Sequence, residues 1–323
     1  VIAVIVTLTG LRELLIKAIP MTLKQAMGAG IGMFIAFIGL KNAGIVVASE
    51  ATYLDLGKFT NPETLLATIG LIIMATLVAR GVKGGVLLGI IVTTLIGIPM
   101  GITKMPSRLI SMPPSLAPTL FQLDIPGALK LSLFPAIFSL FFTDLFDSIG
   151  TFVGVASRTG MLDEEGNLER GSKALLADFI GTITGALLGT STVTTYVEST
   201  AGVSVGGRTG LTSVVVAILL MASIVFSPIA LAIPGAAIAP ALILVGVFMA
   251  TNLNKIDFSN FYEAFPAFLT VIMMPLTFSI SFGLAIGFVA YVAVNLLGGK
   301  GKDVHWMMYL LSGVFILYFA FIR

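Results

Sequence analysis

Long runs of apolar residues, separated by short polar segments, follow one another along almost the entire chain. A run of about 18 to 25 apolar residues is long enough for a helix to cross the hydrocarbon core of a membrane, which is about 30 Å thick. The pattern therefore predicts an all-α protein that crosses the membrane many times. The predicted spans are residues 1–9, 26–48, 64–80, 83–103, 131–156, 172–189, 211–233, 235–253, 266–297 and 304–321.

The run at 266–297 is too long for a single crossing. Pro275 and Gly283 interrupt it, and proline removes a helical hydrogen bond while glycine weakens a helix. We therefore expect two short helices, or a kinked pair, in this part of the chain. The final run, 304–321, is also apolar enough for a span, but its role stays open.

Residues 189–210 form a polar, glycine-rich stretch between two apolar spans. The β-branched part at 192–197 favours extended backbone, and 199–202 can begin a short helix. Such backbone is tolerated inside a membrane only where it lines protein or a cavity, as in the binding sites of transporters. We expect a broken crossing at about 190–209, made of a short strand and a half-helix. A loop outside the membrane is the alternative.

Carboxylates inside apolar spans are the main candidates for function, because an acid in the membrane is costly and by default marks a site. Asp144 and Asp147 are three residues apart and share one helical face. Glu198 lies where the extended piece meets the half-helix, and a helix N-terminus favours a carboxylate. Asp178 stands alone among apolar residues, so we expect it to be structural. For Asp144 and Asp147, bracing a neighbouring helix is the alternative.

Composition supports a membrane protein and excludes other classes. Apolar residues make up 57% of the chain and charged residues 11%, whereas a soluble domain is about a quarter charged. Membrane lipid is therefore the expected partner of most of the surface. With no cysteine and a single histidine, His305, the chain offers no thiolate or histidine cluster for a metal. A net charge of +2 is too small for binding nucleic acid.

Three motifs carry a resemblance to a known family. They are Gly-Ile-Gly-Met-Phe-Ile-Ala-Phe-Ile-Gly-Leu-Lys-Asn-Ala-Gly at 30–44, Phe-Thr-Asp-Leu-Phe-Asp-Ser-Ile-Gly-Thr at 142–151 and Thr-Thr-Tyr-Val-Glu-Ser-Thr-Ala-Gly at 194–202. Across essentially the whole chain, the sequence resembles the xanthine/uracil permease superfamily of nucleobase transporters, and in particular its adenine, guanine and hypoxanthine branch.

The resemblance implies a fold of two inverted seven-helix repeats, divided into a core domain that carries substrate and a gate domain. On that basis, 1–9 is the end of a core helix and 26–103 holds gate helices of the first repeat. Residues 131–233 are core helices of the second repeat, and 235–323 are its gate helices. The N-terminal helices of the family are expected to be missing from this chain, so the isolated chain should not transport.

The resemblance also implies which residues bind substrate. Asp147 falls where relatives have a glutamate that hydrogen-bonds the base, and Glu198 matches the second base-binding carboxylate. The shorter acid at 147 leaves room for a larger base, such as a purine. One of these two acids is expected to carry the coupled proton. The other candidates for the binding site are Asp144, Thr151, Tyr196, the backbone of Val197, and Ser199.

The implied function is import of purine nucleobases (adenine, guanine or hypoxanthine) by proton symport. Sodium is the weaker choice of coupling ion. The protein is expected in the plasma or inner membrane as a multi-pass protein, with no cofactor, no metal site and no enzyme activity. An anion transporter or exchanger of the same fold is the alternative, and an intramembrane aspartyl protease is a remote one. A homodimer formed through the gate helices is left open.

Overall fold

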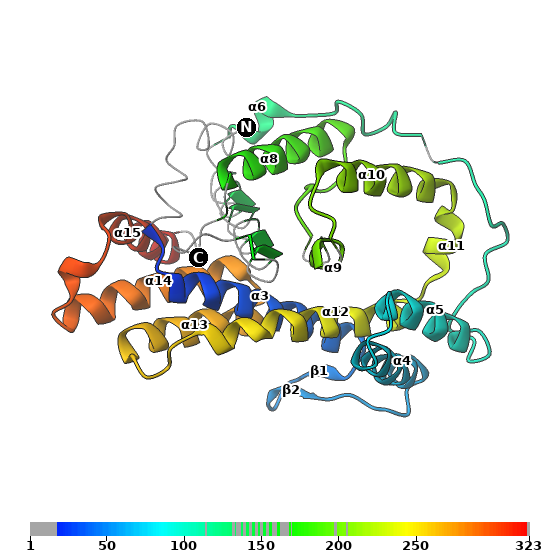
Figure 1. Cartoon of the computed structure of the whole chain (residues 1–323), viewed down its shortest axis with the longest axis horizontal. Helices are drawn as coiled ribbons and strands as arrows, with labels where there is room; N and C mark the ends of the chain where they lie inside the picture. The colour runs from blue at the N-terminus through cyan, green and yellow to red at the C-terminus, as the bar shows by residue number, and fades with distance from the viewer. Residues whose placement is uncertain are drawn as a thin grey trace. The chain divides into compact units, whose positions relative to one another are not determined.

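The structure is a computed structural model that describes residues 18–113, 115–130, 170–196, 199–204 and 206–321. Between 131 and 169 it describes positions 133, 137, 140, 141, 144, 145, 148, 151, 152, 155, 156, 160, 161 and 168. Helices dominate the described chain (Figure 1), which confirms the predicted all-α class. They are α3 (Met21–Asn42), α4 (Pro62–Ala79), α5 (Gly85–Gly97), α6 (Ile125–Ala128), α8 (Gly171–Leu188), α9 (Ser199–Ser204), α10 (Gly210–Val225), α11 (Ser227–Ala232), α12 (Gly235–Ala250), α13 (Phe261–Thr277), α14 (Ile280–Leu297) and α15 (Trp306–Phe321).

Five described helical stretches are long and apolar enough to cross a membrane. They are α3, α4, α8, α14 and Gly235–Lys255, which joins α12 to the short 3-10 helix Thr251–Lys255. Four further apolar helices, α5, α10, α13 and α15, are shorter. These lengths and compositions agree with a multi-pass membrane protein, as predicted. The predicted span 1–9 lies outside the described residues.

The long run at 266–297 is two helices, as predicted, and α13 and α14 lie against each other (Figure 1). The break lies at Phe278 and Ser279, because Phe278 has a left-handed backbone (φ 52°) and the Ser279 hydroxyl accepts an N–H from the first turn of α14. Pro275 and Gly283 do not interrupt the run: Pro275 stays inside α13 and Gly283 inside α14. A proline removes one hydrogen bond, and here the helix continues past it.

The span predicted over 26–48 is helical only up to Asn42. Gly44, with φ at +67°, turns the chain into strand β1 (Val46–Ser49), which pairs antiparallel with β2 (Tyr53–Leu56). Apolar β-branched residues suit a strand as well as a membrane span, so hydropathy alone did not place this boundary.

Two other predicted spans are interrupted. The span at 211–233 divides into α10 and α11. Pro228 lies in the first turn of α11, where a backbone N–H would have no partner within the helix, so proline is tolerated there. At 190–209, where the sequence predicts a broken crossing, the half-helix is present as α9. The predicted strand is not: residues 190–196 have neither helical nor strand pairing. They lie against α8 instead, as described below.

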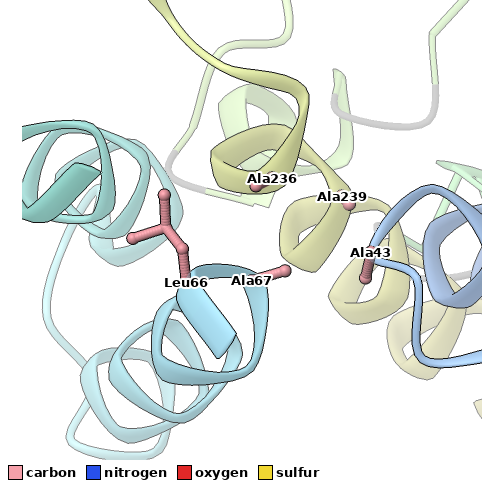
Figure 2. Close-up of a cluster of buried hydrophobic side chains, with 5 residues drawn as sticks. All are labelled: Ala43, Leu66, Ala67, Ala236 and Ala239. Carbon is pink, nitrogen blue, oxygen red and sulfur yellow. The ribbon is translucent and has the colours of Figure 1, made fainter. Parts of the chain in front are cut away.

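The described residues of Val1–Phe34, Ser115–Gly206 and Met249–Arg323 form one compact unit, and those of Ile35–Pro114 and Gly207–Phe248 form another. The predicted core and gate boundaries stay a prediction. In the second unit, four alanines and one leucine gather where α4, α12 and the end of α3 meet (Figure 2). Small residues let helices approach closely, which is how helices pack in membranes. The cluster comprises Ala43, Leu66, Ala67, Ala236 and Ala239.

Candidate functional site

A polar helical face begins at Asp144. Asp144, Ser148 and Thr151 are helical and separated by four and three residues, so they share one face. Ser148 is fully buried, Thr151 is 2% exposed and Asp144 is half-buried. Polar groups buried in protein or lipid are costly unless they are hydrogen-bonded. The partners of Asp144 and Ser148 lie on α8 and on the segment that follows it.

Asp178 on α8 connects this face to the segment after α8. The Ser148 hydroxyl donates to Oδ2 of Asp178 at 2.6 Å, and the Thr195 hydroxyl donates to Oδ1 at 3.0 Å. Asp178 is itself buried, at 9% exposure. Each oxygen of this buried side chain therefore has a hydroxyl partner, which offsets the cost of burying it. One carboxylate therefore joins three parts of the chain.

The segment 190–196, here called the threonine segment, lies along α8. The Thr182 hydroxyl of α8 donates to the backbone carbonyl of Val193 at 2.7 Å, which supplies a partner that a strand would otherwise provide. The side chain of Val193 packs over Gly181 and Gly185 of α8. The helix and its glycines thus hold an unpaired stretch of backbone in place.

A second carboxylate anchors the other end of the threonine segment. The Thr192 hydroxyl donates to Oδ1 of Asp144 at 3.0 Å, and it lies 3.3 Å from the Thr182 hydroxyl. Asp144 and Asp178 are close enough for their charges to act on each other. Two acids from different helices therefore hold Thr192 and Thr195. Between them lie Val193 and Thr194, and the Thr194 hydroxyl is 3.4 Å from the Ser148 hydroxyl.

The structure brings together only part of the predicted site. Asp144 and Thr151 lie on the buried polar face, while Tyr196 is 67% exposed and ends the threonine segment. Ser199 begins α9, and its N–H donates to the carbonyl of Tyr196 at 3.1 Å. The remaining three, Asp147, Val197 and Glu198, lie outside the described residues.

The hydrogen bonds of Asp178 agree with the expectation that it is structural, but the sequence did not predict its partners. It was expected to be structural because its immediate neighbours in the sequence are apolar, and both of its oxygens have partners, 30 and 17 residues away. Ser148 and Thr195, which supply those partners, were not among the predicted site residues. A usable signal was present: a lone acid in an apolar helix needs donors, and the threonines that follow that helix can supply them.

The described residues contain no group of three or more Asp, Glu, His or Cys placed to hold a metal ion. The hydrogen-bonding groups of the site are instead carboxylates, hydroxyls and backbone carbonyls. These groups can orient a ligand that carries N–H and carbonyl groups.

Comparison with known proteins gives a consistent result. The model of a permease family matches residues 1–286. A permease of Methanocaldococcus jannaschii is 50% identical over 100% of this chain and 74% of its own length. The guanine/hypoxanthine permease PbuG of Bacillus subtilis is 43% identical over 100% of this chain and 73% of its own length. The adenine permease AdeP of Escherichia coli is 41% identical over 98% of this chain and 71% of its own length.

Among solved structures, the chain is similar to the transmembrane domain of a cyanobacterial bicarbonate transporter, BicA. The TM-score is 0.62 with 18% sequence identity, and the match covers 88% of this chain and 73% of the other. At that identity the likeness establishes the fold alone. The chain therefore has the fold of a membrane transporter domain.

Proposed function

Because the chain belongs to the xanthine/uracil permease family of nucleobase transporters, we propose that it imports purine nucleobases across the cell membrane by proton symport. The candidate substrates are adenine, guanine and hypoxanthine. The observation that supports them most directly is the similarity, over nearly the whole chain, to permeases named for these bases. The likeness to a bicarbonate transporter concerns the fold and gives an anion substrate no support of its own.

The chain is a membrane permease and not an enzyme, since its relatives are permeases. This removes the intramembrane protease from consideration. The chemistry to explain is therefore recognition and movement of a solute, without bonds being made or broken.

In this proposal, Asp147 and Glu198 hold the base by accepting hydrogen bonds from its N–H groups. Tyr196, Ser199 and the backbone of Val197 line the same side as Glu198, because they adjoin it in sequence. Thr151 and Asp144 line the other side, on the helical face that precedes α8. The anchoring of Thr192 by Asp144 supports this placement, since it brings that face next to the threonine segment.

The coupled proton is proposed to bind to Asp147 or Glu198. An acid in a low-dielectric site has a pKa that responds strongly to neighbouring charge and to the bonds it accepts. Binding of the base can therefore change its protonation, which is the requirement for coupling. Sodium is the weaker alternative, because carboxylate and backbone oxygens also suit that ion.

The substrate is tested by uptake into cells that lack their own nucleobase carriers. The labelled bases are adenine, guanine, hypoxanthine, xanthine and uracil. The full-length protein is compared with its Glu198→Gln and Asp147→Asn variants. Saturable purine uptake that either variant loses, at normal membrane levels, supports the proposal. If the protein reaches the membrane and takes up sulfate but no base, the anion alternative replaces it.

Uptake under two conditions separates the coupling ions. A proton ionophore should abolish accumulation of the base, whereas replacing sodium with choline should not. Accumulation that survives the ionophore and disappears without sodium would assign the coupling to sodium.

A further inference from the structure

Asp178 accepts hydrogen bonds from two chain segments that the proposed function makes important. Ser148 directly follows Asp147, and Thr195 lies three residues before Glu198. We propose that Asp178 is a positioning residue of the nucleobase site: by holding Ser148 and Thr195, it sets the two segments that carry the base-binding acids relative to each other. This inference rests on the proposed function and adds to it a residue that does not itself touch the base.

The chemistry of Asp178 fits this role. Both carboxylate oxygens have a hydroxyl donor, at 2.6 Å and 3.0 Å, and the group is buried. A buried carboxylate is costly, and these two bonds stabilise it in one orientation. A carboxylate fixed on both oxygens is a rigid bridge between Ser148 and Thr195. The group is also only 9% exposed, which leaves it little room to contact the base itself.

The threonine segment does not depend on Asp178 alone. Thr182 bonds the carbonyl of Val193, Val193 packs over Gly185, and Asp144 holds Thr192. Loss of the Asp178 bonds should therefore leave the segment on α8 and shift only its end at Thr195. The expected defect is misplacement of the base-binding groups in a protein that still folds.

Kinetics of uptake test the proposal with Asp178→Asn, Ser148→Ala and Thr195→Val in the full-length protein. Each should raise the KM for labelled adenine, guanine or hypoxanthine by roughly tenfold, about the effect of one charge-assisted hydrogen bond. The maximal rate per transporter in the membrane should change little. Thr195→Ser, which keeps the hydroxyl, should restore the original KM. The double variant Asp178→Asn with Thr195→Val should have a KM little higher than that of Asp178→Asn alone, because both changes break the same Asp178–Thr195 hydrogen bond.

The matched control is Thr184→Val on the same helix. The Thr184 hydroxyl is exposed and bonds only the carbonyl of Ile180 within its own helix at 2.8 Å, among the contacts of the described residues. Its removal should leave the KM unchanged. An equal rise in KM for this control would overturn the proposal, since any lost hydroxyl on α8 would then have the same effect.

Two other outcomes would also overturn it. If Asp178→Asn lowers membrane level and thermal stability while the KM of the remaining transporter is unchanged, the residue is merely structural. If the variant loses accumulation against a gradient but retains exchange of base with an unchanged KM, Asp178 carries the coupled proton instead.

A substrate-independent readout separates this proposal from the proposed function. Residues 1–323 contain no cysteine, so Tyr196→Cys places the one thiol of this part of the protein next to Thr195, and any cysteine elsewhere in the full-length protein is first replaced by serine. Its rate of modification by a maleimide should change severalfold when Asp178→Asn or Thr195→Val is added, and not when Thr184→Val is added. If the parent carries no base but these rates behave as stated, the proposed function fails and the positioning role stands. If the rates are all equal, the positioning role fails.

Discussion

Gly185 on α8 lies so close to Val193 that a Cβ built on the glycine would be 2.8 Å from Cγ2 of Val193. The same added atom would lie 3.0 Å from the Thr190 hydroxyl and 3.1 Å from the Ser191 carbonyl oxygen. Since real Cβ atoms need more room than this, the missing side chain is what allows the threonine segment to approach the helix. Close backbone approach of this kind is a recognised use of glycine.

Gly185→Ala should therefore displace the threonine segment and lower uptake roughly tenfold, because overpacking a tight contact typically costs about 1–3 kcal/mol. Uptake of labelled purine at equal membrane levels measures the effect. Adding Val193→Ala should restore much of the activity by making room for the new methyl group. Gly313→Ala is the control, since no described residue lies within 4 Å of a Cβ at that position in α15. Full activity of Gly185→Ala alone would show that the contact tolerates a methyl group.

The α13–α14 pair depends on a similar contact. A Cβ on Gly287 of α14 would overlap the hydroxyl of Thr270 on α13, which is fully buried and donates to the carbonyl of Pro266 at 2.9 Å. Gly287→Ala should lower the stability of the pair by about 1–3 kcal/mol, through displacement of Thr270. Thermal unfolding in detergent measures this. The control is Gly235→Ala, because no residue in the described part of the chain lies within 4 Å of a Cβ at that position. Equal melting temperatures for the two variants would contradict it.

The sequence predicted the helices better than their ends. Hydropathy located α14 and most of α13 because they are largely apolar, but it missed the first turn of α13, which carries Glu263. The break at Phe278 depends on one left-handed residue and the cap that follows it. No propensity favours a phenylalanine in that conformation. The strand that begins at Val46 was missed for a related reason: an apolar β-branched run satisfies both a membrane span and a hairpin.

The candidate site, like the helices, could be predicted from the sequence only in part. The threonine segment could be predicted, because glycine, threonine and an acid between two apolar spans are unlike any lipid-facing helix. The role of Asp178 could not be predicted from local pattern. Its partners, Ser148 and Thr195, reach it through tertiary packing, and only the folded chain shows which hydroxyls face which acid.

Arg170 provides a prediction about stability. It precedes α8 with a left-handed backbone (φ 60°, ψ 24°) and makes no side-chain cap to the helix. Left-handed geometry costs a non-glycine residue about 1–2 kcal/mol. Arg170→Gly should remove that cost and raise the stability of the protein by about 1 kcal/mol, whereas Arg170→Ala should not. Thermal unfolding of the three proteins in the same detergent decides this, and a gain with alanine as large as that with glycine would point to the charge instead of the backbone.

Thr192 provides the last prediction, because it tests the anchor at Asp144. Its hydroxyl donates to the Asp144 carboxylate at 3.0 Å, and such a bond to a charged group contributes about 1.5–3 kcal/mol. Thr192→Val keeps the shape of the side chain but leaves the carboxylate without this donor, so uptake of labelled purine should fall at least roughly tenfold. Thr192→Ser retains the hydroxyl and should keep most of the activity. The double variant Asp144→Asn with Thr192→Val should take up no less purine than Thr192→Val alone, since an uncharged amide loses less than a carboxylate when the hydroxyl donor is removed. If valine and serine variants behave alike, the Asp144 anchor is not needed for transport.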